Sequence, residues 1–205
     1  MGIELFARGL VIGFSIAAPV GPVGMLVIRR TLAEGRLLGL LTGLGAAVAD
    51  ALYGCVGAFG LTFISSFLMG HAFWTKLIGG AFLVYLGIST FLAKPREEST
   101  GTSNVRYAPA FLSTMVLTLA NPATILSFMA VFAGLGLGMK AGDYGAAAVV
   151  VAGVFMGSAT WWLLLSSGVS LVRHKLKPDT MKWINYGSGA FLSAFGIYAL
   201  ASLAL

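Results

Sequence analysis

Residues 183–197 read WINYGSGAFLSAFGI, and residues 74–88 read WTKLIGGAFLVYLGI. The two stretches align without a gap, and seven of the fifteen positions carry the same residue: the leading Trp, the run Gly-Ala-Phe-Leu and a later Gly-Ile pair. Apolar composition alone produces scattered matches, but it does not easily produce these residues in one register. The sequence therefore predicts an internal repeat.

The composition is that of an integral membrane protein. Of 205 residues, 58% are hydrophobic and only 10% are charged, and the mean hydropathy is +0.93. A soluble domain of this length could not bury so much apolar surface. The net charge of +6 does not indicate a nucleic-acid partner, because the basic residues form short clusters between apolar runs. The single Cys55 excludes an intrachain disulfide, and no metal site is expected.

Six apolar runs are long enough to cross a bilayer as helices. The first lacks a positively charged start, so we expect it to be retained and not cleaved as a signal peptide. The polar stretch 94–107, KPREESTGTSNVRY, divides the chain into units 1–93 and 108–205 of three spans each. The predicted spans are Leu5–Ile28, Leu37–Phe67, Phe73–Ala93, Ala108–Leu137, Tyr144–Val172 and Trp183–Leu205.

The basic residues predict an orientation. With six spans, the connections after the first, third and fifth lie on one side, and they hold ten of the thirteen Lys and Arg residues. The positive-inside rule places this side, including the linker 94–107, in the cytoplasm and both termini outside. The ten are Arg29, Arg30, Arg36, Lys94, Arg96, Arg106, Arg173, Lys175, Lys177 and Lys182, against Arg8, Lys76 and Lys140 on the other side.

The repeated stretches fall in the third and sixth spans, so the repeating unit has three spans. Because three is odd, the two units must face opposite ways across the membrane. The predicted fold is therefore all-α, with two inverted-topology repeats of three helices, an architecture found in many secondary transporters. It requires the fourth span to resemble the first.

The first and fourth spans share a helix breaker. Residues 18–22 read APVGP and residues 120–123 read ANPA, each inside an apolar run. A proline in a helix interior costs roughly 3 kcal/mol or more. Paired breaks in corresponding positions indicate a substrate site, where half-helix N-termini can hold a carboxylate and freed carbonyls an ammonium group or cation. The alternative is a pair of tolerated kinks. The expected substrate-binding residues here are Pro19, Gly21, Pro22, Asn121 and Pro122.

Asp50 is the acid expected deepest in the membrane, near the middle of the second span. A carboxylate there costs about 2.5–3.5 kcal/mol on insertion scales, so it should face the bundle interior. We expect it to bind substrate as a counter-charge or to couple transport to protons; the alternative is a protonated side chain bonded to a backbone carbonyl. Small residues share its helical face: Gly43, Ala46, Ala47, Gly54 and Gly57.

These motifs resemble those of the LysE/RhtB family of amino-acid exporters, along nearly the whole chain. The resemblance rests on residues 19–54, PVGPVGMLVIRRTLAEGRLLGLLTGLGAAVADALYG, and on residues 121–132, NPATILSFMAVF. It implies efflux of amino acids across a bacterial inner membrane, driven by a proton gradient or the membrane potential. The matching positions are Pro19, Gly21, Pro22, Asp50, Asn121 and Pro122.

The leading functional hypothesis is an alternating-access antiporter that takes a small amino acid or a derivative as its substrate and works in the lipid bilayer. An ion or metal permease of the same architecture is the alternative, although one carboxylate is few for a hard cation. An intramembrane enzyme is disfavoured, because no span holds a histidine and only one holds an aspartate. No catalytic residue or cofactor is therefore expected. A homo-oligomer is compatible with the sequence.

Overall fold

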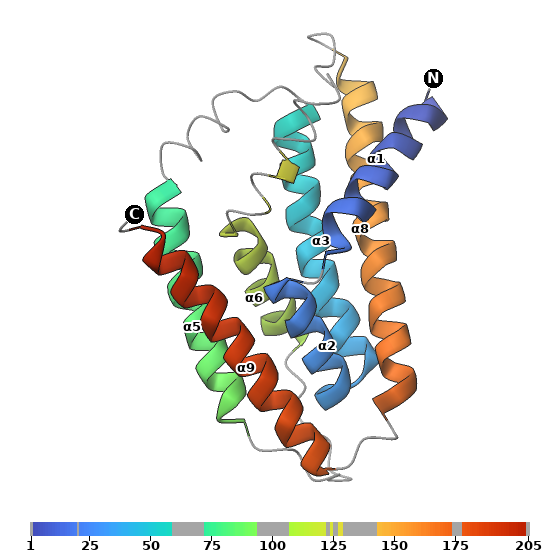
Figure 1. Ribbon diagram of the computed structural model, residues 1–205. Coiled ribbons are helices and arrows are strands. Elements are labelled where there is room, and N and C mark those ends of the chain that lie inside the picture. Colours follow the sequence, from blue (N-terminus) through green and yellow to red (C-terminus); the bar gives the residue numbers. More distant parts are fainter. Residues whose placement is uncertain are drawn as a thin grey trace.

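The computed structural model describes residues 2–19, 21–58, 72–93, 107–121, 124, 127–128, 143–173 and 178–203. These residues are all-helical, without a strand among them, which confirms the predicted class (Figure 1). The helices are α1 (Gly2–Ala17), α2 (Pro22–Glu34), α3 (Arg36–Ala58), α5 (Ala72–Phe91), α6 (Tyr107–Leu119), α8 (Tyr144–Arg173) and α9 (Pro178–Ala201).

The break predicted in the first span is present. α1 ends at Ala17, α2 begins at Pro22, and the two helices are bent by 79°. Gly21 is extended, with φ −104° and ψ −160°, and Pro22 opens α2, where its missing N–H is not needed by the helix. In the second half, α6 ends at Leu119 and Asn121 lies beyond it; Pro122 lies outside the described residues.

The connection between the first two spans is shorter in the structure than the sequence predicted. Arg29 and Arg30 lie inside α2, which runs to Glu34, and not in a loop. The hydropathy drops after Ile28, but no helix breaker occurs before Gly35. Gly35 has φ 102°, a backbone conformation that favours glycine, and it alone separates α2 from α3.

α1 and α8 run parallel and in close contact. The backbone of Gly9 lies against Val150, and that of Gly13 lies one turn further along, against Val154. From the other side, the backbone of Gly153 meets that of Phe6. Small residues let membrane helices approach this closely.

α3 and α6 form a second parallel pair. Gly45 lies against the carbonyl of Phe111, and two turns further the Tyr53 hydroxyl donates to the Leu119 carbonyl at 2.6 Å. Both contacts join residues 66 positions apart in the sequence. α6 therefore follows α3 in a fixed register up to the end of α6.

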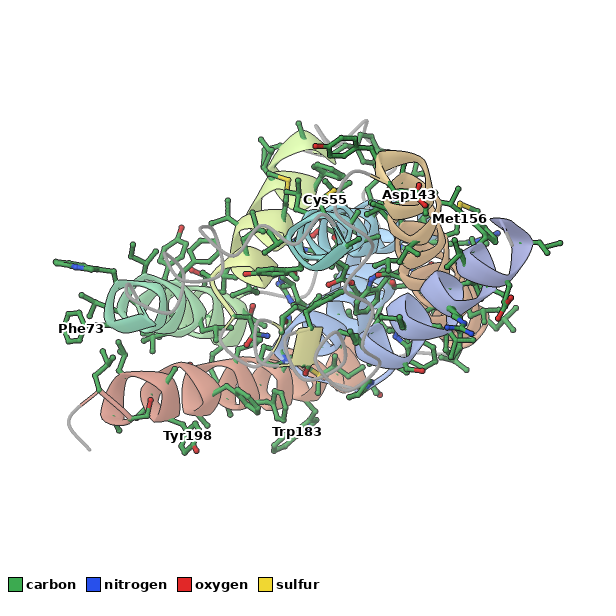
Figure 2. All side chains as sticks on the ribbon, turned by 90° about the horizontal axis from the view of Figure 1, so that it is seen from above. Cys55, Phe73, Asp143, Met156, Trp183 and Tyr198 are labelled. Carbon is green, nitrogen blue, oxygen red and sulfur yellow. The ribbon has the colours of Figure 1, made fainter. Side chains whose placement is uncertain are left out.

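Two further pairs are antiparallel. In α5 and α9, Gly80 lies against the carbonyl of Gly196, and Gly87 lies against that of Gly189. α3 and α8 are also antiparallel, because Gly43 of α3 packs on Trp162 and Gly54, further along α3, packs on Val154, which comes earlier in α8. Figure 2 shows α5 and α9 on one side of the bundle, α1 and α8 on the other, and α3 and α6 between them.

The described helices fit a membrane protein, although they do not by themselves define six spans. α3 and α8 are each long and apolar enough to cross a membrane, and the bent pair α1–α2 would be a third. Large apolar side chains cover the outside: Phe73, Trp183 and Tyr198 point outward in Figure 2 and are 53%, 74% and 72% exposed. A lipid environment explains this exposure.

Candidate functional site

Asp50 lies in the interior, as predicted, in contact with α8. Only 3% of the residue is exposed. Its Oδ2 accepts a hydrogen bond from Ser158 Oγ at 2.7 Å, and Trp162 Nε1 donates to the same Ser158 Oγ at 3.1 Å. Trp162, Ser158 and Asp50 thus form a buried chain of hydrogen bonds between α8 and α3. Among the described residues, the partner of Asp50 is therefore the hydroxyl of Ser158.

The small residues on the face of Asp50 allow this contact. Gly43 lies against the Trp162 side chain, and Gly54 is in ordinary contact with Val154. Ala46 and Ala47, 1% and 0% exposed, belong to a core cluster that also includes Trp162 and residues of α2. Larger side chains here would push α8 away and separate Ser158 from Asp50.

The C-terminal ends of α1 and α6 lie near the level of Asp50. Gly13 contacts Val154, so Ala17, one turn further along the parallel pair, is about level with Ser158. Leu119 contacts Tyr53, so the last turn of α6 is level with Asp50. The C-terminal ends of α1 and α6, the start of α2 and one carboxyl group therefore gather at one depth.

A helix C-terminus carries partial negative charge on its unpaired carbonyls, and a helix N-terminus carries partial positive charge. The level of Asp50 can therefore favour a cationic group near the α1 and α6 ends and an anionic group near the start of α2. An amino acid carries both kinds of group. Tyr53 satisfies one carbonyl at the α6 end, and its ring stacks on Phe128 with centroids 5.6 Å apart.

A second polar cluster lies nearer the end of the bundle that carries the basic residues. Arg30 of α2 donates to Thr42 Oγ1 of α3 at 3.2 Å, and its other described bonds go to α6. The neutral acceptors on α6 are the Ala110 carbonyl (3.0 Å), Thr114 Oγ1 (3.2 Å) and Ser113 Oγ (3.1 Å). Thr42 lies eight residues before Asp50, about 12 Å along α3.

Other contacts also hold the C-terminal part of α2 at this end. Arg29 Nε donates to Asn185 Oδ1 of α9 at 3.2 Å, and the Asn185 amide donates to the Ala93 carbonyl after α5. Arg173 of α8 donates to the Leu32 carbonyl at 3.0 Å. In Figure 1 the ends of α2 and α8 and the starts of α3 and α9 meet at the bottom, and N and C lie toward the top.

Five of the six sequence-predicted residues lie in the described part of the chain, and they differ in their surroundings. Asp50 and Pro22 are buried, Gly21 and Asn121 are half-buried, and Pro19 is exposed at the bend. Ser158 and Arg30, which tie Asp50 and α2 to other helices, were not predicted, and nothing in their local sequence distinguishes them. Among the described residues, no group of three or more His, Cys, Asp or Glu side chains could hold a metal ion.

The sequence matches one family of known proteins. The family model of the LysE type translocators matches residues 14–203, and the chain belongs to this family. It is 28% identical to a putative amino acid efflux protein, YcgF, of Bacillus subtilis, over 95% of this chain and 94% of the relative.

Two other relatives are similar to most of the chain. The chain is 29% identical to the uncharacterized membrane protein YahN of Escherichia coli, over 85% of this chain and 78% of the relative. It is 24% identical to the lysine exporter LysE of Corynebacterium glutamicum, over 95% and 97%. No solved structure matches the chain. The resemblance read from the sequence is confirmed, and the protein is a multi-pass membrane translocator of the LysE type.

Proposed function

We propose that this protein exports amino acids or amino-acid derivatives across the bacterial inner membrane. The observation that carries the proposal is the buried Asp50, held by Ser158 at the level where α1 and α6 end. An acid at membrane depth without a described ion pair serves a transport pathway more readily than it serves stability. The names of the relatives YcgF and LysE support amino acids as the substrate class.

The substrate-binding residues we propose are Pro19, Gly21, Pro22, Asn121 and Pro122 together with Asp50. The breaks expose backbone groups, so the substrate's carboxylate would lie near the start of α2 and its ammonium group near the ends of α1 and α6. Asp50 would then carry the counter-charge or the coupled proton. Coupling to a proton gradient or the membrane potential makes the protein an antiporter or a potential-driven exporter.

The helix pairing supports two inverted repeats, units 1–93 and 108–205. In the alignment of residues 74–88 with 183–197, Gly80 corresponds to Gly189 and Gly87 to Gly196. Exchanging the two units therefore turns the Gly80–Gly196 contact into the Gly189–Gly87 contact, which is also present. The same exchange of units converts the parallel pair α1–α8 into the parallel pair α6–α3.

Alternating access would then use α2 as the moving element. Its C-terminal part is held by Arg29 and Arg30 at the basic end, which the positive-inside rule assigns to the cytoplasm, with both termini outside. Loading from the cytoplasm would require these hydrogen bonds to open. The described hydrogen-bond acceptors of Arg30 on α3 and α6 are neutral.

Transport by the purified protein in liposomes tests the proposal. Vesicles loaded with a panel of radiolabelled amino acids are given an outward or inward pH gradient, with and without a membrane potential. The proposal expects gradient-dependent flux of one chemical class of amino acid. Flux of divalent cations with no flux of any amino acid would instead support the permease.

A further inference from the structure

We propose that the Thr118 hydroxyl of α6 is a binding group for the ammonium group of the cargo. This inference rests on the proposed export function and names a residue that the breaker motifs do not include. Its starting point is an unpaired group: Thr118 is 3% exposed, and its Oγ1 is the one buried side-chain polar atom, within the described part of the chain, that has no hydrogen-bond partner. A buried hydroxyl without a partner is costly and calls for a reason.

Three of the other buried threonines show that this pairing is available to a threonine in these helices. A helical threonine can donate to the carbonyl four residues earlier. Three buried threonines make this bond: Thr31 to Val27 (2.8 Å), Thr42 to Leu38 (2.7 Å) and Thr114 to Ala110 (3.0 Å). Thr118 occupies the next position on the face of Thr114, yet its hydroxyl does not make the corresponding bond.

The position of Thr118 places it at the proposed substrate level. Since Leu119 contacts Tyr53 in the parallel pair, Thr118 lies about 3 Å along the axis from the level of Asp50. Its face looks toward α2, because Thr114 on that face accepts from Arg30 and the neighbouring Leu117 packs in one core cluster with residues of α2. Thr118 of α6 and Asp50 of α3 therefore lie at about the same depth, on two helices that pack against each other.

The chemistry of this level favours an ammonium group. A hydroxyl oxygen accepts hydrogen bonds, the C-terminal ends of α1 and α6 carry partial negative charge, and Asp50 supplies a carboxyl group. An ammonium group has three donors and no acceptor, so it satisfies Thr118 and such neighbours together. The hydroxyl of Thr118, which has no partner within the described part of the protein, is then available to bind the cargo.

The test compares Thr118→Val, which keeps the shape and removes the hydroxyl, with Thr118→Ser, which keeps the hydroxyl. Ser167→Ala is the control, because it removes a hydroxyl that is bonded within its own helix, to the Leu163 carbonyl, and lies more than two turns along α8 from Ser158. Each purified variant is measured for its melting temperature with and without cargo, and for the KM of efflux from liposomes. The cargo is an amino acid that the wild type transports, and its methyl ester, which keeps the ammonium group.

We expect Thr118→Val to melt at or above the wild-type temperature without cargo, and to raise KM about three- to tenfold, the loss of one hydrogen bond. The cargo-induced rise in melting temperature should shrink for the amino acid and for its ester alike, and Thr118→Ser should restore both values. Ser167→Ala should leave KM unchanged.

Three results would overturn the inference while leaving the export function intact: an unchanged KM in Thr118→Val, a clear loss of melting temperature without cargo, or an effect on the amino acid that the ester does not share. If the wild type neither transports nor is stabilised by any member of the panel, the export function fails and the inference fails with it.

Discussion

Ser158 of α8 donates a 2.7 Å hydrogen bond to Asp50 of α3 across 108 residues of sequence. The same Ser158 accepts from Trp162 one turn along α8, so one hydroxyl connects an indole N–H with the buried carboxyl group. This pair joins two helices that the proposed repeats place in corresponding positions. Protonation of Asp50, or binding of a substrate to it, would therefore change the hydrogen bond that joins α3 to α8.

Ser158→Ala should reduce transport more than it reduces stability. It removes the one described hydrogen bond to Asp50 and leaves Trp162 Nε1 without its acceptor, which costs about 1–3 kcal/mol. We expect slower flux with a changed pH profile, measured in liposomes. Ser167→Ala on the same helix is the control, because Ser167 bonds only to the Leu163 carbonyl among its described contacts. Equal flux profiles for both variants would contradict a role for Ser158.

Gly157→Ala should destabilise the α1–α8 pair. An added Cβ at Gly157 would overlap the carbonyl of Leu10, and overpacking of this kind costs about 1–3 kcal/mol. Gly168→Ala in the same helix meets nothing within 4 Å and should gain up to about 1 kcal/mol from helix propensity. Thermal unfolding in detergent measures both, and an equal shift for the two variants would argue against this packing.

The orientation can be tested with single cysteines in a Cys55→Ser background. Ile3→Cys lies at the exposed start of α1 and Thr180→Cys in the exposed first turn of α9, at the basic end. We expect an impermeant maleimide added to intact cells to label Ile3→Cys and to label Thr180→Cys only after the membrane is opened. The reverse labelling would invert the direction assigned to the transporter.

Arg30→Met should loosen the basic end without unfolding the protein. The hydroxyls of Ser113 and Thr114 each donate to the Ala110 carbonyl, so removing Arg30 leaves neither of them unpaired. We expect a stability loss of about 1–3 kcal/mol, typical of hydrogen bonds to a charged group. Amide hydrogen exchange of α2 should become faster, with Arg8→Met as the control because Arg8 bonds only to the exposed Glu4 in the described contacts. Unchanged exchange in Arg30→Met would remove α2 from the role of moving element.

The features that local chemistry determines could be predicted from the sequence. Proline and glycine act within a few residues, so the break before Pro22 and the end of α6 at Leu119 could be located from APVGP and ANPA. The burial of Asp50 followed from the cost of a carboxylate in hydrocarbon and from its small-residue face. In contrast, the end of the apolar run at Ile28 was mistaken for the end of a helix.

The features that depend on contacts between distant helices could not be predicted. The hydroxyl of Ser158 meets Asp50 only because α8 crosses α3 in one register, and hydropathy periodicity carries no information on that register. The acceptors of Arg30 come from α3 and α6, and the unpaired hydroxyl of Thr118 becomes visible only when its neighbours are placed.

The most direct measurement is gradient-driven amino-acid efflux from liposomes containing Asp50→Asn, compared with wild type and with Asp179→Asn. The Asn side chain keeps the size of Asp50 and can still accept from Ser158, but it cannot carry a negative charge or titrate a proton. Asp179 is exposed in the first turn of α9, where it pairs with Lys182, so its replacement controls for the loss of one carboxylate. We expect Asp50→Asn, at equal protein content, to lose the flux that Asp179→Asn retains. Undiminished, gradient-dependent flux in Asp50→Asn would contradict the account.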